Sequence, residues 1–288
     1  MEYIETKSIL SKLRQTDSLF GISYNMNLYR GCQHACVYCD TRSECYQVGD
    51  ISRIKIKKNA IDLLKKELAT KRQKGTIGTG SMNDPYMPAE KEIGLTRKSL
   101  EVIAGKNFPI HIITKSNLVT RDIDLIKEIS KTYAAVSITI TTSDDKIAKK
   151  LEPNASSSSE RFKALETLAK NGIYTGITLM PLLPFINDSA ENIKNILKQA
   201  KDCGVSYTIP MFGLTLRKGS REYLYQFFEQ KYPELKTKYE NTFGENYICN
   251  SPNFKNLYNT FYEQIANSKI KSKMDFFHSK TNQQLSLF

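Results

Sequence analysis

Short apolar strands alternate with amphipathic helices along most of this chain, from about residue 20 to residue 212. In the helical segments, apolar residues recur at spacings of three and four. Strands are expected at residues 22–29, 76–80, 110–114, 134–141, 173–179 and 205–210, and helices at residues 57–72, 95–104, 121–130, 159–170 and 190–201. This order indicates parallel βαβ units with right-handed crossovers. We therefore expect an α/β fold, a partial (β/α)6 barrel of the TIM type with a helical C-terminal extension.

The character of the sequence changes near residue 214, where Tyr, Phe, Lys and Glu become frequent. Helices are expected there at residues 222–231 and 256–267. Residues 270–283 are polar and basic, which predicts a mobile tail. The predicted domains are the barrel at residues 1–213, with a cysteine loop at 31–40, a helical extension at 214–269 and a flexible tail at 270–288.

Charge and hydropathy limit the partners of the chain. No run of 18 apolar residues occurs, and the N-terminus lacks the basic-then-apolar pattern of a signal peptide. We expect a cytoplasmic protein with no membrane partner. The net charge of +12 favours polyanions such as nucleic acid. A general richness in lysine explains the same charge without any such partner.

The densest chemical signal is a group of cysteines with the spacing Cys-x3-Cys-x2-Cys, namely Cys32, Cys36 and Cys39. Three thiolates can hold three irons of a 4Fe–4S cubane and leave the fourth iron open to another ligand. A zinc site is the alternative, with His34 or Cys45 as a further ligand, but zinc sites usually show two ligand pairs. A disulfide framework is not expected in a chain of this size without an export signal.

Polar residues follow the predicted strands at the ends where parallel barrels gather their chemistry. The cysteine loop follows the first strand, residues 80–84 follow the second, and Lys115 follows the third. We expect these segments to meet at one mouth of the barrel.

The cysteine loop, with Tyr38 just before its last cysteine, resembles the radical S-adenosylmethionine (SAM) superfamily, and the likeness extends over residues 20–212. Further segments resemble the spore photoproduct lyase-like group of that superfamily, which is often labelled DNA repair photolyase. These segments are residues 80–86, 113–116, 137–139, 151–153, 215–217 and 247–253.

The resemblance implies two cofactors, a 4Fe–4S cluster on the three cysteines and S-adenosylmethionine on its open iron. One electron from an external donor then yields methionine and a 5′-deoxyadenosyl radical. It also implies contacts to S-adenosylmethionine: Tyr38 near the adenine, residues 80–83 at the amine, Lys115 at the carboxylate, and Ser137 or Thr139 at the ribose. The full set of expected contacts is Tyr38, Gly80, Ser81, Asn83, Lys115, Ser137, Thr139 and Arg161.

Two positions depart from the pattern of spore photoproduct lyase. Ser81 stands where that enzyme has the cysteine that returns a hydrogen atom to the product radical, and Asp40 stands where it has a tyrosine. A serine hydroxyl is a far poorer hydrogen donor than a thiol. Repair of the spore thymine dimer by that route is therefore not expected. Cys249 is another thiol, although a buried structural cysteine is the plainer interpretation.

The last five residues, Gln284, Leu285, Ser286, Leu287 and Phe288, resemble the pentapeptide that docks bacterial proteins onto the replication sliding clamp. Apolar anchors on a polar tail suit such docking at weak affinity. The alternative is that this apolar end packs against the protein itself.

These observations favour a radical SAM enzyme acting on DNA, in repair or modification, by lyase or related C–H-activating chemistry. A second hypothesis keeps the radical chemistry but takes tRNA, a peptide or a small metabolite as substrate. A third is a non-catalytic protein that binds DNA or the clamp, with a structural or sensing cluster.

Overall fold

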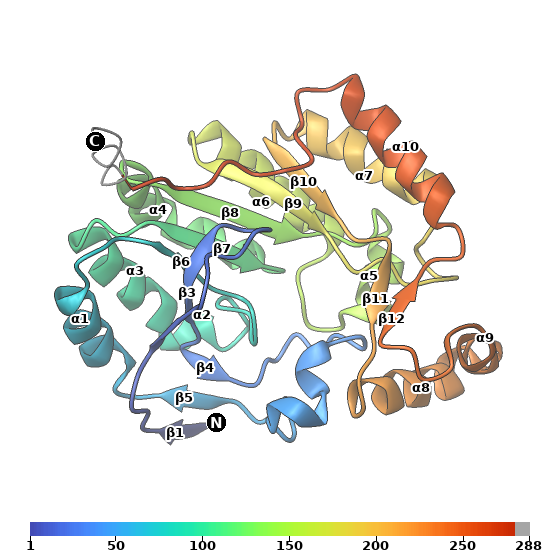
Figure 1. Cartoon of the computed structure of the whole chain (residues 1–288), viewed down its shortest axis with the longest axis horizontal. Coiled ribbons are helices and arrows are strands. Elements are labelled where there is room, and N and C mark those ends of the chain that lie inside the picture. Colours follow the sequence, from blue (N-terminus) through green and yellow to red (C-terminus); the bar gives the residue numbers. More distant parts are fainter. Residues whose placement is uncertain (280–288) are drawn as a thin grey trace, which may run out of the picture.

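The computed structural model describes residues 1–279, and its centre is a curved sheet of parallel strands (Figure 1). The strand order is β10-β9-β8-β7-β6-β3-β2, and only the edge strand β2 runs antiparallel to its neighbour. The bounds are β2 Leu10–Lys12, β3 Ile22–Met26, β6 Thr76–Gly78, β7 Ile110–Thr114, β8 Ala134–Thr139, β9 Tyr174–Leu179 and β10 Tyr207–Pro210. All six predicted strands are confirmed as the parallel strands of this sheet. The barrel is partial because β3 pairs with β2 instead of β10.

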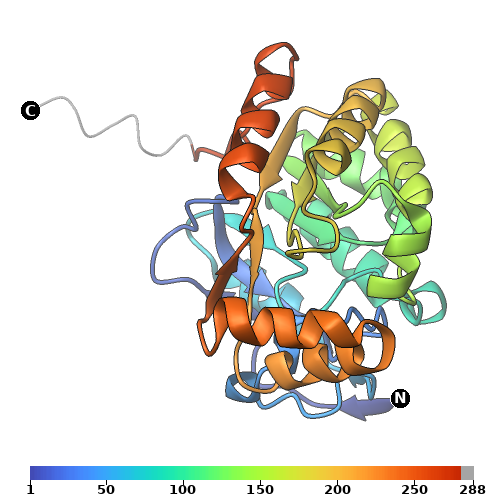
Figure 2. The ribbon, with the colours of Figure 1, turned by 90° about the vertical axis from the view of Figure 1, so that its right-hand side faces the viewer.

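Helices connect successive parallel strands and pack against one another along one face of the sheet (Figures 1 and 2). They are α1 Ala60–Thr70, α2 Glu90–Ile93, α3 Leu95–Gly105, α4 Ile123–Ser130, α5 Asp145–Leu151, α6 Ser158–Lys170 and α7 Ala190–Asp202. Helix α6 begins with a capping pair: Ser157 accepts a hydrogen bond from Glu160 N at 3.2 Å, and Glu160 accepts one from Ser157 N at 2.7 Å. This reciprocal pair fixes the start of α6.

A small second sheet, which the sequence did not predict, holds the cysteine loop at both of its ends. Its strands are β1 Glu2–Ile4, β5 Lys55–Lys57 and β4 Tyr29–Arg30, in the order β1-β5-β4. The loop leaves β4 and returns to β5. At its start Gly31 has a φ of +89°, and a Cβ there would lie 2.6 Å from the Ile51 carbonyl oxygen. Only glycine therefore permits this close entry into the loop.

The C-terminal extension is mainly helical, as predicted, but it also contains a two-stranded antiparallel sheet. The elements are β11 Gly213–Thr215, α8 Ser220–Lys231, α9 Pro233–Phe243, β12 Ile248–Asn250 and α10 Phe254–Ala266. Strands β11 and β12 pair with each other and join the barrel to this extension. Within residues 1–279, no helix is both long and apolar enough to cross a bilayer.

The prediction of a flexible tail from residue 270 is wrong for residues 270–279. Lys271 pairs with Tyr207 on the free edge of β10, and Met274 is 5% exposed. Tyr133 donates a hydrogen bond to the Asp275 carbonyl, and Phe276 fills the space beside Gly21. The segment passes the amino ends of β10, β9 and β8 and reaches the residue before β3. The pentapeptide at residues 284–288 lies outside the described residues, and its docking to a sliding clamp stays a prediction.

Candidate active site at the C-terminal ends of the parallel strands

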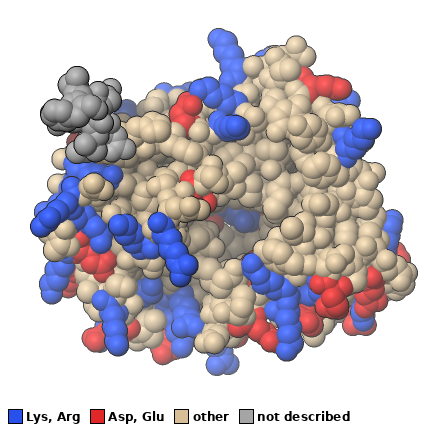
Figure 3. Space-filling model, viewed as in Figure 1, with Lys and Arg blue, Asp and Glu red and all other residues tan. Residues whose placement is uncertain are grey.

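A pocket of about 370 Å³ opens at the carboxyl ends of the parallel strands, and Figure 3 shows its mouth near the centre of the molecule. Its lining comes from the cysteine loop and from residues at the ends of β6 to β10. The segments predicted to meet at one barrel mouth therefore do so. The volume lies within the usual range for small-molecule sites, roughly 300–1,000 Å³.

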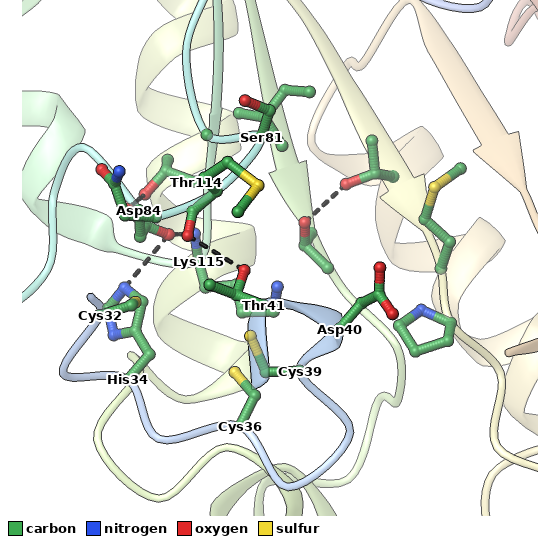
Figure 4. A pocket seen from close by; sticks show the side chains of 18 of the residues that line it. Cys32, His34, Cys36, Cys39, Asp40, Thr41, Ser81, Asp84, Thr114 and Lys115 are labelled. Carbon is green, nitrogen blue, oxygen red and sulfur yellow. Dashed lines mark hydrogen bonds and ion pairs between the residues drawn. The ribbon is translucent and has the colours of Figure 1, made fainter. Parts of the chain in front are cut away.

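The three predicted cysteine ligands lie on one loop at one end of this pocket (Figure 4). The loop is fixed by backbone hydrogen bonds from Cys32 N to Ile51 O at 2.7 Å and from Val37 N to Leu151 O at 2.9 Å. Burial raises the pKa of the Cys32 thiol to about 11 and that of Cys36 well above its usual value. Thiolates in so buried a place need a cationic partner such as iron.

His34 is committed to structural contacts. Its Nδ1 lies 3.2 Å from the Asn154 carbonyl and its Nε2 lies 3.2 Å from Asp84 Oδ2. Among residues 1–279, no group of three or more His, Cys, Asp and Glu side chains could hold a single metal ion. The zinc alternative therefore has no support in the geometry. In a cubane cluster each of three irons needs only one cysteine ligand.

Asp84 joins the cysteine loop to the end of β7. Its carboxylate accepts hydrogen bonds from Thr114 Oγ1 at 2.6 Å, Lys115 N at 2.7 Å and Tyr86 N at 2.9 Å, and it faces His34. Burial alone would raise the pKa of Asp84, but His34 and these donors lower it to about 2. Asp84 is therefore an ionised anchor that orients Lys115 and the loop together.

A second buried group lies behind the loop. Tyr38 donates a hydrogen bond to Glu152, and Arg161 Nη2 lies 2.5 Å from the other Glu152 oxygen. Burial alone would raise the pKa of Glu152, but Arg161 and Lys115 lower it. The Lys115 ammonium lies 5.8 Å from the centroid of the Tyr38 ring and lines the pocket. Tyr38 and Lys115 are thus at the site, whereas Arg161 lies behind its wall.

The wall after β6 is made of backbone and small polar groups. Gly80 has a φ of +90°, and a Cβ there would lie 2.3 Å from the Ile113 carbonyl oxygen. Ser81 and Asn83 also line the pocket, and Asn83 donates to the Tyr29 carbonyl at 2.8 Å. The Thr79 hydroxyl is buried and has no hydrogen-bond partner among the described residues. This wall therefore carries one buried hydroxyl, that of Thr79, without a partner among the described residues.

The two candidates for the ribose differ in position. Thr139 lines the pocket and shares a 2.7 Å hydrogen bond with Thr178 on the neighbouring strand. Ser137 is fully buried and does not line the pocket, because it lies between His111 Nε2 and the Tyr207 hydroxyl, at 2.8 Å from each. Thr139 is therefore placed for ligand contact, and Ser137 supports the wall from behind.

At the mouth lies Asp40, one of the two positions that depart from the family pattern. It has a structural role that the sequence did not reveal. Asp40 accepts hydrogen bonds from Tyr46 at 3.1 Å and from Arg217, and both Asp40 and Tyr46 line the pocket. Arg217 also donates to the Tyr247 hydroxyl at 2.7 Å and lies 4.5 Å above that ring. The carboxylate thus attaches the C-terminal extension to the cysteine loop.

The opposite wall, at the ends of β9 and β10, is mostly apolar, with Met180, Pro181, Met211 and Leu214 in the lining. None of these was singled out from the sequence. Cys249 is buried, with its thiol 3.4 Å from the Asn246 carbonyl, and it does not line the pocket. Within the described lining, the three loop cysteines are the only thiols.

Taken together, the residues fit a 4Fe–4S cluster with three protein ligands and a zwitterionic ligand beside it. The donor set is three cysteines, the adjoining wall carries an ammonium at Lys115, and the backbone at Gly80 packs so closely on the Ile113 carbonyl that no Cβ fits there.

Comparison with known proteins agrees with this geometry. The sequence profile of the Radical SAM superfamily matches residues 26–200. An uncharacterized protein of Methanocaldococcus jannaschii is 37% identical over 217 residues, which cover 74% of this chain and 78% of that protein. A radical SAM Nα-GlyT isomerase of Pseudomonas phage M6 is 24% identical over 181 residues, 63% of this chain and 37% of that protein.

Among solved structures, the spore photoproduct lyase complexed with dinucleoside spore photoproduct has a similar fold. It superimposes with a TM-score of 0.66 and 16% sequence identity, over 90% of this chain and 79% of that one. A point mutant of spore photoproduct lyase gives a TM-score of 0.69 at 14% identity, over 93% and 80% of the two chains.

Proposed function

The chain belongs to the radical SAM superfamily, whose members use a 4Fe–4S cluster and S-adenosylmethionine, and from this premise we propose that it is a radical SAM enzyme that acts on DNA, in repair or modification. The observation that carries the chemical part is the cysteine loop at the pocket. Three thiols share one end of a ligand-sized cavity, and His34 inside the loop is held by Asp84 and Asn154. A cluster held by these three cysteines would adjoin the cavity.

Cys32, Cys36 and Cys39 would hold the cluster, and Lys115 with residues 79–83 would hold S-adenosylmethionine. When bound, the two cofactors supply a 5′-deoxyadenosyl radical that removes a hydrogen atom from a C–H bond. Asp84 keeps the Lys115 backbone in place, and Tyr38 closes the wall beside the loop through its bond to Glu152. These residues orient the carboxylate of the cofactor and keep water from the reacting end of the pocket.

Support for DNA as the substrate comes from three directions. The net charge of +12 favours a polyanion. A relative is named as a radical SAM Nα-GlyT isomerase, and a protein of similar fold was solved with a dinucleoside spore photoproduct. At the mouth, Arg217 lies among the Tyr46 and Tyr247 rings, so a cation and aromatic faces border the entrance.

The reaction itself is expected to differ from reversal of the spore photoproduct. Ser81 lines the pocket where a thiol is expected, and within the described lining only the cluster cysteines carry sulfhydryl groups. This composition of the described lining supports a reaction that does not depend on a hydrogen atom from a thiol of the pocket wall. We propose lyase-related C–H chemistry in which the product radical is resolved by another route.

The test is formation of 5′-deoxyadenosine by the reconstituted protein without oxygen, with dithionite as reductant, in the presence and absence of duplex and single-stranded DNA. Stimulation by DNA, together with a new nucleoside in digests of that DNA, is the expected result. Cleavage of S-adenosylmethionine that DNA neither stimulates nor alters would reject DNA and leave tRNA, a peptide or a metabolite as substrate. No cleavage under any condition would favour a structural or sensing cluster.

A further inference from the structure

Helix α10 carries a row of exposed aromatic rings on its outer face. Phe254, Tyr258 and Tyr262 follow one another at intervals of four residues and are 43%, 45% and 37% exposed. Neighbouring rings touch, with centroids 6.1 Å apart for the first pair and 4.4 Å apart for the second. The apolar residues that attach α10 to the protein, such as Leu257 and Phe261, lie on its buried face. The exposed row is therefore not required to fill the core.

This aromatic row is continuous with the pocket wall. Phe254 and Tyr258 pack edge-on against Phe212, at 5.6 and 6.4 Å between centroids. Phe212 lies between Met211, which lines the pocket, and strand β11. Ile248 on β12 and Tyr247 just before that strand are 59% and 44% exposed, and Tyr247 contacts Arg217 at the mouth. The row on α10 is thus joined through buried Phe212 to the segment that carries Met211 of the pocket wall.

The size and charge of the row limit what it can bind. At 150–250 Å² per aromatic side chain, the three rings expose on the order of 250 Å², far below the roughly 800 Å² per partner of a stable protein interface. Single-stranded nucleic acid needs less, because each ring can stack one base. In Figure 3, α10 lies on the side where the pocket opens, the surface between them carries few charges, and Lys and Arg side chains lie on the other side of the mouth.

We propose that Phe254, Tyr258 and Tyr262 form a stacking platform for the unpaired bases of a DNA strand whose target nucleotide occupies the pocket. This inference rests on the proposed function and specifies the form of the substrate: the target is presented in single-stranded or locally opened DNA. The Lys and Arg side chains across the mouth follow the phosphates, while the rings on α10 hold the neighbouring bases.

The chain contains no Trp, so one introduced Trp is a unique reporter of stacking. We would compare the Tyr258→Trp variant with Tyr3→Trp, since Tyr3 is 64% exposed on β1, in a different part of the molecule from α10 (Figure 1). An oligothymidylate of about 12 nucleotides is the probe. Saturable quenching of fluorescence in Tyr258→Trp, with none in Tyr3→Trp, is the expected result.

Affinity for the same oligonucleotide is then measured by fluorescence anisotropy. Tyr258→Ala and Tyr262→Ala should each weaken binding about 5- to 100-fold, the range measured for loss of one stacking ring. Tyr3→Ala should bind as the wild type does. Thermal unfolding of each variant shows whether it is folded, and Tyr262 makes no ring contact with Phe212, so its removal leaves the pocket wall intact.

Unchanged oligonucleotide affinity in both α10 variants would overturn the inference, as would a dimer of the wild type that Tyr258→Ala dissociates without loss of DNA affinity. If the wild type responds to DNA in the 5′-deoxyadenosine assay and both α10 variants respond equally, the platform alone is rejected. If the wild type itself neither binds DNA nor responds to it, the proposed substrate is rejected together with the platform.

Discussion

The two walls of the pocket are built on different principles. The wall that carries the cysteine loop and the ends of β6 and β7 is held by buried charges, with Asp84 and Glu152 each bonded to several partners. The wall at the ends of β9 and β10 presents Met180 and Met211 to the cavity. A buried polar network fixes the orientation of a ligand, whereas thioether side chains adapt their shape. The first wall therefore suits the cofactors, and the second leaves the choice of substrate open.

The largest effect is expected at the cluster ligands. Cys36→Ala should lose the cluster and with it the formation of 5′-deoxyadenosine. The loss of activity should exceed the roughly 10- to 100-fold seen when a residue that hydrogen-bonds to a metal ligand is removed. Cys45→Ala is the matched control, because Cys45 is exposed and outside the pocket lining. Iron content, visible absorbance and product formation are the measurements. Equal activity in both variants would disprove the assignment of the ligands.

The buried network behind the loop should contribute measurably to the free energy of unfolding. Arg161→Ala leaves the buried Glu152 carboxylate without its ion-pair partner, so the free energy of unfolding in urea should fall by about 3–5 kcal/mol. Lys170→Ala breaks an ion pair with Glu166 that is exposed, and should cost less than about 1 kcal/mol. Similar small losses in the two variants would show that the cofactor wall is no more rigid than the surface.

Lys115 tests the electrostatics of the same wall. If its ammonium faces the carboxylate of S-adenosylmethionine, Lys115→Ala should weaken binding of that cofactor about 10- to 100-fold, the value of a hydrogen bond to a charged group. Lys115→Arg should recover part of the affinity, and Lys66→Ala on the exposed face of α1 serves as the control. Calorimetry on the reconstituted protein without reductant measures binding alone. Full affinity in Lys115→Ala would place the carboxylate elsewhere.

The smallest expected effects should show which of the two residues predicted at the ribose, Thr139 or Ser137, contacts it. Thr139→Val removes a hydroxyl that lines the pocket, and affinity for S-adenosylmethionine should fall about fivefold. Ser137→Ala should leave that affinity unchanged and instead lower stability by about 1–3 kcal/mol, because His111 and Tyr207 lose a buried partner. The reverse pattern would mean that Ser137 turns toward the ligand.

Much of the cofactor wall could be predicted from the sequence because its signals are local. The cysteines lie within one loop, Gly80 lies two residues after β6, and Lys115 lies directly after the apolar strand β7. The pairing of Tyr38 with Glu152 could not be predicted, since 114 residues separate them. Asp84 matched a family segment, but its bond to His34 likewise depends on the folded barrel.

For residues 270–279, the prediction from local sequence was wrong. Their polar composition predicted mobility, but Met274 is buried and Phe276 packs against Gly21. Composition describes the average over the segment. A few buried apolar side chains are enough to hold such a segment against the barrel. The apolar substrate wall was missed for a related reason: Met180 and Met211 look like ordinary core residues until the fold turns them toward the cavity.

The central claim is that the radical made at this pocket takes hydrogen from DNA. The most direct test is to supply single-stranded DNA carrying deuterium on carbon, one nucleotide type at a time, and to measure the mass of the 5′-deoxyadenosine formed. We expect one nucleotide type to transfer deuterium to this product and Cys36→Ala to form none. Product formation that is stimulated by DNA but carries no deuterium from any nucleotide would contradict it.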